Sequence, residues 1–146
     1  MKIKRVFGIN ACFTAGDMDE AERFFRDIFS AKMGPDMPHL LKYGHRAKAA
    51  WLGTDVPFRL ELSECVNEEG PIGRSIKRAA PGFQFIGLEV EDIDEAIAEL
   101  RAKGIKVSDK LQVSEYSMEC MIHPKSAYGL IIELVQVIKP RKDREW

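Results

Sequence analysis

The sequence contains few cysteines, and their positions argue against a cross-linked protein. Cys12, Cys65 and Cys120 are odd in number and far apart. They therefore favour neither a disulfide framework nor the close spacing of a structural zinc site. Unpaired thiols persist in a reducing compartment, which predicts a cytoplasmic location. The 146 residues are enough to bury a hydrophobic core without such cross-links.

Long apolar runs and an excess of one charge sign are also missing. No stretch approaches the roughly 18 consecutive apolar residues that a membrane-spanning helix needs, so we expect no membrane partner. The formal net charge of −1 creates no global field that would attract nucleic acid. The segment 139–146 mixes basic and acidic residues and predicts a solvated, charged tail.

The first half of the chain shows a β-α-β-β-β pattern. Residues 6–15 are rich in strand formers, and an amphipathic helix is expected to begin at Asp17. Residues 32–45 contain glycines and prolines and predict a loop with a short strand. AKAAWLG and FRLELSE then favour two strands joined by a turn at residues 53–57.

The same order recurs in the second half. FQFIGLEV predicts a strand, and Asp92 is the expected N-cap of a helix that buries Ile93, Ala96, Ile97 and Leu100. IKVSDKLQV, YSMECMIHP and LIIELVQV supply three further extended segments. The sequence therefore predicts an α+β protein with two tandem βαβββ modules, at about 5–65 and 80–138, within one domain over 1–146.

Two short matches support a duplication. DMDEA at 17–21 matches DIDEA at 92–96 at an offset of 75, and LEL at 60–62 matches IEL at 132–134 at an offset of 72. Matches in the same order at similar offsets indicate repeated modules. The alternative is that both motifs are only common helix-start and strand fragments.

One carboxylate stands in the last strand of each module. In FRLELS, Glu61 shares a face with Arg59 and Ser63, opposite an apolar face. Glu133 interrupts the apolar run LIIELV, where a buried charge is costly without a partner. Such carboxylates are candidate acid-base groups or metal ligands. The alternative for each is an edge-strand glutamate that points to water.

The repeat also relates the first strands of the two modules. Adding 75 to position 10 makes Asn10 and Phe85 equivalent. If a pseudo-twofold axis relates the modules, positions 10, 61, 85 and 133 should converge on one concave surface.

Three segments carry a resemblance to a known family. MIHPKSAYGLIIELVQ at 121–136 is very like an HPK-x-x-x-G-x-x-x-EL-V ending, and residues 85–93 and 59–62 match a middle strand and an end-of-module strand. Over residues 5–138 the chain resembles the vicinal oxygen chelate (glyoxalase/bleomycin resistance/dioxygenase) superfamily, most closely its methylmalonyl-CoA epimerases and glyoxalase I-type members. The resemblance implies a curved, partly open barrel-like sheet around one cavity, and a homodimer.

The resemblance also concerns a metal site. Members typically hold a divalent metal with two histidines and two Glu or Gln side chains, and the two carboxylates correspond to Glu61 and Glu133. Asn10 and Phe85 stand at the histidine positions, so we expect no tightly bound transition metal. Two carboxylates and an amide could still hold a hard divalent cation such as Mg²⁺ or Ca²⁺. The histidines of this chain are expected in loops or at the surface: His39, His45 and His123.

Two functions fit these residues. In the first, the protein is an isomerase, epimerase or lyase: Glu61 and Glu133 transfer a proton next to a carbonyl of a small carbonyl or thioester compound, and Asn10 supports the enolate. In the second, it binds an antibiotic-like molecule without chemistry. Cys12 is expected to be a packed thiol, because no partner base is visible for a nucleophile. The predicted substrate-binding residues are Arg59, Phe85, Trp51, Cys12 and Tyr128.

Overall fold

The structure is a computed structural model that describes residues 1–55 and 58–139. The predicted charged tail therefore lies outside the described residues beyond Lys139, as does the end of the predicted turn at 53–57. The chain divides into two compact units, one formed by Gly8–Gln84 and the other by Met1–Phe7 together with Phe85–Trp146. No helix within the described ranges is long and apolar enough to cross a membrane.

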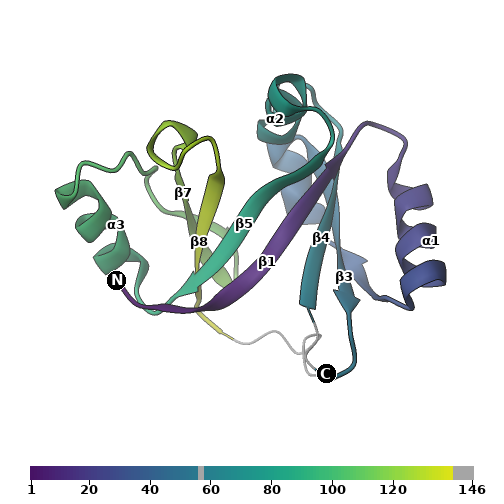
Figure 1. Cartoon of the computed structure of the whole chain (residues 1–146), viewed down its shortest axis with the longest axis horizontal. Helices are drawn as coiled ribbons and strands as arrows, with labels where there is room; N and C mark the ends of the chain where they lie inside the picture. Colours follow the sequence, from purple (N-terminus) through teal and green to yellow (C-terminus); the bar gives the residue numbers. More distant parts are fainter. Residues whose placement is uncertain (56–57, 140–146) are drawn as a thin grey trace. The chain divides into compact units, whose positions relative to one another are not determined.

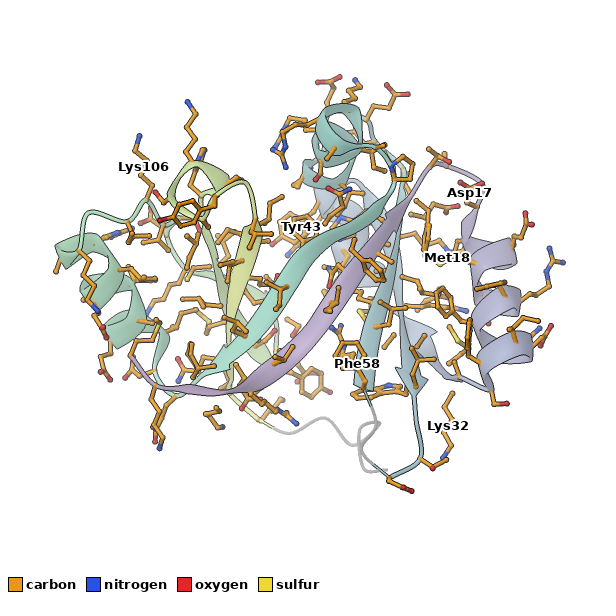
Figure 2. All side chains as sticks on the ribbon, viewed as in Figure 1. Asp17, Met18, Lys32, Tyr43, Phe58 and Lys106 are labelled. Atoms are coloured by element: carbon orange, nitrogen blue, oxygen red, sulfur yellow. The ribbon has the colours of Figure 1, made fainter. Side chains whose placement is uncertain are left out.

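The unit Gly8–Gln84 contains a sheet covered on one face by a helix (Figure 1). Its strands pair in the order β2-β3-β4-β1, with only β1 and β4 parallel. Helix α1 packs against β3 and β4. Met18, at the start of α1 (Figure 2), is fully buried in a cluster with Leu60 and Leu62. The elements are β1 Ile3–Phe13, α1 Met18–Phe29, β2 Lys32–Asp36, the 3₁₀ helix η1 Pro38–Tyr43, β3 His45–Leu52, β4 Phe58–Cys65 and α2 Pro71–Ala79.

The second unit repeats this construction. Its strands pair in the order β5-β8-β7-β6, with only β5 and β8 parallel. Helix α3 packs against β7 and β8, and its predicted apolar face is buried with Cys120 and Leu134. The elements are β5 Gly82–Val90, α3 Ile93–Ala102, β6 Leu111–Ser114, β7 Ser117–Ile122, the 3₁₀ helix η2 Pro124–Ser126 and β8 Ile131–Val137.

Residues 1–7 are bound to the second unit by backbone and side-chain contacts. The Glu91 amide donates to the Lys2 carbonyl at 3.3 Å. Lys4 and Arg5 donate to the buried Glu89 carboxylate at 2.6 and 2.7 Å. Burial alone would raise the pKa of Glu89, but these bonds outweigh it and hold the pKa below its usual range. The start of β1 is thus an integral part of this unit.

The element order confirms the prediction of an α+β chain with a β-α-β-β-β pattern twice. Two details differ from expectation. Residues 32–45 contain the strand β2 and also the helix η1. The extended segment IKVSDKLQV forms a strand only at Leu111–Ser114, and before it Val107 makes an isolated bridge. The Ser108 hydroxyl accepts from the Met121 amide at 3.0 Å, so a side chain replaces a backbone partner there.

The two predicted helix starts are satisfied differently. Asp92 accepts from the Glu95 amide at 2.9 Å, as an N-cap does. Asp17 makes no side-chain cap bond. The first amide of α1, at Met18, instead donates to the Glu64 carboxylate on β4 at 3.1 Å. A residue distant in sequence therefore caps α1.

This difference predicts unequal effects of two matched substitutions. Asp92→Ala should lower the free energy of unfolding by about 1 kcal/mol, because it removes a cap bond. Asp17→Ala should cost clearly less, since no helix amide depends on its side chain. Urea denaturation of both variants measures the difference. Equal losses at the two positions would contradict the assignment of the caps.

Candidate functional site

Most predicted site residues lie on one face of a single unit. In the β3-β4-β1 segment, Asn10 lies beside Glu61, Cys12 beside Ser63, and Trp51 beside Arg59. Residues two apart on a strand share a face, and the alternate β4 residues Leu60 and Leu62 pack against α1. The face that carries Glu61 is therefore the one turned away from that helix, as predicted.

Glu61 is buried and accepts hydrogen bonds from three side chains. Asn10 Nδ2 donates to Oε1 at 2.9 Å, and Ser63 Oγ donates to the same oxygen at 3.3 Å. Arg59 Nη2 donates to Oε2 and forms an ion pair with it. The alternative of an edge-strand glutamate pointing to water is wrong for Glu61, which is 8% exposed. These three donors, rather than water, stabilise the negative charge of Glu61.

Arg59 is the cation of this cluster, and a glycine makes room for it. The side chain is only 6% exposed. A Cβ atom at Gly8 would lie 3.0 Å from Arg59 Nη1 and 2.9 Å from the Arg59 carbonyl oxygen. Such distances are too short for any side chain at position 8 without moving the arginine. Gly8 therefore allows the guanidinium to lie over β1.

Cys12 shares this face but lacks the properties of a nucleophile. The residue is fully buried. Burial, the charge of Glu61 and the thiol of Cys65 together raise the pKa of Cys12 to about 12. At neutral pH the group is thus a thiol and not the reactive thiolate. The geometry agrees with the predicted packed thiol.

His45 departs from its prediction as a loop or surface residue. It begins β3 beside Cys65 and is 9% exposed, because η1 delivers the chain directly into the antiparallel ladder. Burial lowers its pKa despite the opposing charge of Glu61. Its Nδ1 atom has no hydrogen-bond partner within the described part of the chain. His39 lies half-buried in η1, and His123 is exposed.

Glu133 and Phe85 belong to the other unit. Glu133, which was expected to be a buried charge or an edge-strand glutamate pointing to water, is half-buried and lies between these two alternatives. In the ladder Glu133 lies between Gly87 and Met121. Burial and the charge of Glu133 raise the pKa of Cys120 to about 11. Phe85 is buried and lies beside Ile131.

The register corrects the predicted equivalence of Asn10 and Phe85. Asn10 lies beside Glu61, whereas Gly87 is the β5 residue beside Glu133. The β5 residue that corresponds to Asn10 is therefore Gly87, two residues after Phe85. Because residues two apart on a strand share a face, Phe85 still lies on the same face of β5 as Gly87. The offset of 75 was measured between helix starts and carries no information on strand pairing. Gly87, the β5 residue that pairs with Glu133, has no side chain to offer at this position.

The remaining predicted residues lie in contrasting places. Trp51 is half-buried beside Arg59. Tyr128 is fully exposed in the turn before β8, with a left-handed φ of 54°. Sequence reasoning named Ser63 only as a member of the polar face and did not single out Gly8. Ser63 stands two residues from Glu61, and that spacing was the available signal.

A divalent metal does not fit the donors on the Glu61 face. The Glu61 carboxylate is already neutralised by the Arg59 guanidinium, and Asn10 presents its N–H to that carboxylate. Over residues 1–55 and 58–139, no group of three or more His, Cys, Asp or Glu side chains is arranged to hold a metal. Mg²⁺ and Ca²⁺ would need several free oxygen donors, so they fit no better than transition metals.

The chain is thus built from two βαβββ units, each with a carboxylate in its last strand. Residues 11–122 match the family described as the Glyoxalase/Bleomycin resistance protein/Dioxygenase superfamily. The chain belongs to this superfamily, as its motifs predicted.

Relatives of known function are epimerases. The chain is 28% identical to the mitochondrial methylmalonyl-CoA epimerase of Mus musculus and 27% identical to that of Homo sapiens, over 123 residues in each case. The match with the mouse protein covers 82% of this chain and 67% of that protein, and the match with the human protein covers 82% and 68%. Epimerases are isomerases, so these relatives confirm the prediction of an isomerase-type enzyme.

Solved structures agree in fold. A variant methylmalonyl-CoA epimerase of Streptomyces coelicolor, in complex with 2-nitronate-propionyl-CoA, has a TM-score of 0.82 at 22% identity and covers 94% of this chain and 100% of its own. A methylmalonyl-CoA epimerase in complex with methylmalonyl-CoA and NH4+ has the same TM-score and identity, covering 94% and 96%. At this identity the similarity establishes the fold.

Proposed function

We propose that this protein is an epimerase or isomerase that moves a proton on the carbon next to the carbonyl of a small acyl thioester, such as an acyl-CoA. The observation that carries the proposal is the buried Arg59–Glu61 ion pair with Asn10 bonded to the same carboxylate. The named activity of the relatives and the thioester ligands of the similar structures support this substrate class.

The residues suit the reaction in distinct ways. Removal of an α-proton leaves negative charge on the carbonyl oxygen, and a preorganised donor stabilises it. Arg59 provides a cation, and Asn10 and Ser63 hold Glu61 in place through their hydrogen bonds. Glu133, the second carboxylate that the sequence singles out, is half-buried, and we propose it as the proton-transfer group.

Hydrogen exchange at the α-carbon tests this function. We expect the protein to accelerate deuterium incorporation from D₂O into methylmalonyl-CoA or propionyl-CoA, followed by NMR, because epimerisation passes through removal of that proton. Lys106→Ala, at an exposed position, is the matched control and should exchange at the parent rate. The absence of exchange with any acyl-CoA would contradict the proposal.

The half-buried Trp51 beside Arg59 supports a second candidate. An aromatic ring next to a cation suits the binding of an aromatic anion, so the protein would sequester such a molecule without chemistry. If the protein sequesters such a molecule, aromatic anions should raise its melting temperature, and Trp51→Ala should abolish this rise. The protein should then show no hydrogen exchange at the α-carbon of acyl-CoA compounds.

Assembly and location are further proposals. Strands β2 and β6 stand at the ends of the strand order, and exposed strand edges are commonly covered by pairing. We therefore propose a homodimer, which light scattering at micromolar concentration would test. The cysteines Cys12, Cys65 and Cys120 are all free and buried, which supports a cytoplasmic location. We also keep the proposal of a single glyoxalase-like domain over 1–146.

A further inference from the structure

A buried cation is already built into the Glu61 face. Arg59 is 6% exposed and ion-paired with Glu61. Its partner Glu61 is fixed in turn by Asn10 and Ser63, and Gly8 leaves the space that Nη1 occupies. Four neighbouring positions on β1 and β4 thus cooperate to hold one guanidinium group.

Burial of this ion pair costs free energy, so its presence calls for a functional explanation. Moving a charged pair out of water carries a desolvation penalty, and well-packed apolar residues in its place are often neutral or more stable. Leu60 and Leu62 on the opposite face show that β4 accepts apolar residues readily. The same burial makes the charge effective, because a cation in a low dielectric acts over several ångströms.

We propose that the Arg59 guanidinium supplies, from within the chain, the positive charge that a divalent metal would otherwise supply at Glu61. Both cations would occupy the same carboxylate, so a bound metal and the Arg59–Glu61 pair exclude each other. The inference rests on the proposed function for its chemistry: Arg59 stabilises the oxygen that becomes negative when the thioester loses its α-proton. Its exclusion of metal does not depend on that function.

A guanidinium and a metal ion act differently on an enolate oxygen. Arginine remains protonated and donates N–H groups in a planar fork. It therefore stabilises a developing oxyanion by hydrogen bonding and charge, and no ligand of the site has to be deprotonated first. The substrate class that fits is an acyl thioester whose anionic intermediate carries its charge on one oxygen.

Metal binding tests the exclusion directly. The parent protein, dialysed against Co²⁺ and then against buffer, should retain far less than one equivalent per chain by elemental analysis. One retained equivalent would overturn the proposal, whether or not the protein is an epimerase. Treatment with EDTA should leave the α-exchange rate of the parent unchanged, and loss of the rate would overturn it as well.

Chemical rescue tests the role of the charge. Arg59→Ala combined with Glu61→Gln removes both charges and leaves neither partner buried alone, so this variant should fold. We expect its α-exchange rate to fall by ~10²- to 10³-fold and low-millimolar guanidinium chloride to restore part of it, whereas equal sodium chloride should not. A purely structural role predicts no difference between the two salts, and that result would overturn the proposal. A parent without exchange refutes the proposed function, and the Co²⁺ result then decides the exclusion by itself.

Discussion

Arg59→Met should lower the free energy of unfolding by about 3–5 kcal/mol at neutral pH, because removing one partner of a buried ion pair strands the other charge. Glu61 is 8% exposed, and its remaining hydrogen-bond donors on the described part of the chain, Asn10 and Ser63, are neutral. Urea denaturation monitored by circular dichroism measures the loss. Arg23→Met, at an exposed position on α1, controls for the change of residue type and should cost much less.

A second variant separates charge from packing. Adding Glu61→Leu to Arg59→Met should recover most of the lost stability, since an apolar pair replaces the stranded carboxylate. A loss that persists in this double variant would mean that Arg59 stabilises the unit through its packing alone.

Glu133→Gln should lower the rate of α-proton exchange by ~10²-fold or more, the usual scale for a lost acid-base group. Glutamine keeps the shape of the side chain but cannot take up a proton. Fold and ligand affinity should therefore change little, which thermal melting and binding of an unreactive acyl-CoA analogue would measure. If Glu133 serves stability only, the substitution should be neutral or stabilising.

The matched control for this experiment is Glu91→Gln. Glu91 lies in the same unit, and its side chain is 60% exposed, so this variant should exchange at the parent rate. Full activity in Glu133→Gln would refute the acid-base role, and Glu61 would become the next candidate. A sequestering protein gives a different pattern: no exchange in the parent, and changed ligand affinity in the variant.

The patterns that depend on neighbouring residues were predictable. The alternation in FRLELS placed Glu61 opposite Leu60 and Leu62, and the structure agrees. The period of the helix from Asp92 named the buried face of α3 correctly. Local spacing is sufficient in both cases, because the side chains of one strand or helix are fixed by its own geometry.

The features that depend on strand register were not predictable. The two-residue shift in the second unit follows from how β5 meets β8, although the predicted proximity of Asn10 and Glu61 holds. The capping of α1 by Glu64 and the burial of His45 likewise need contacts between distant segments. A motif match assigned equivalent positions to the two modules, but it could not report which side chains lie side by side.

The division of β1 between the two units has a consequence for synthesis on the ribosome. All residues of the unit Gly8–Gln84 have been made when Gln84 is added, so this unit can fold while the remainder is being translated. The other unit needs Lys2, Lys4 and Arg5 to contact Glu91 and Glu89, and those partners are made more than 80 residues later. Lys2, Lys4 and Arg5 therefore have no partners in this unit until Glu89 and Glu91 have been made. Deleting residues 1–7 should consequently weaken the second half of the protein more than the first.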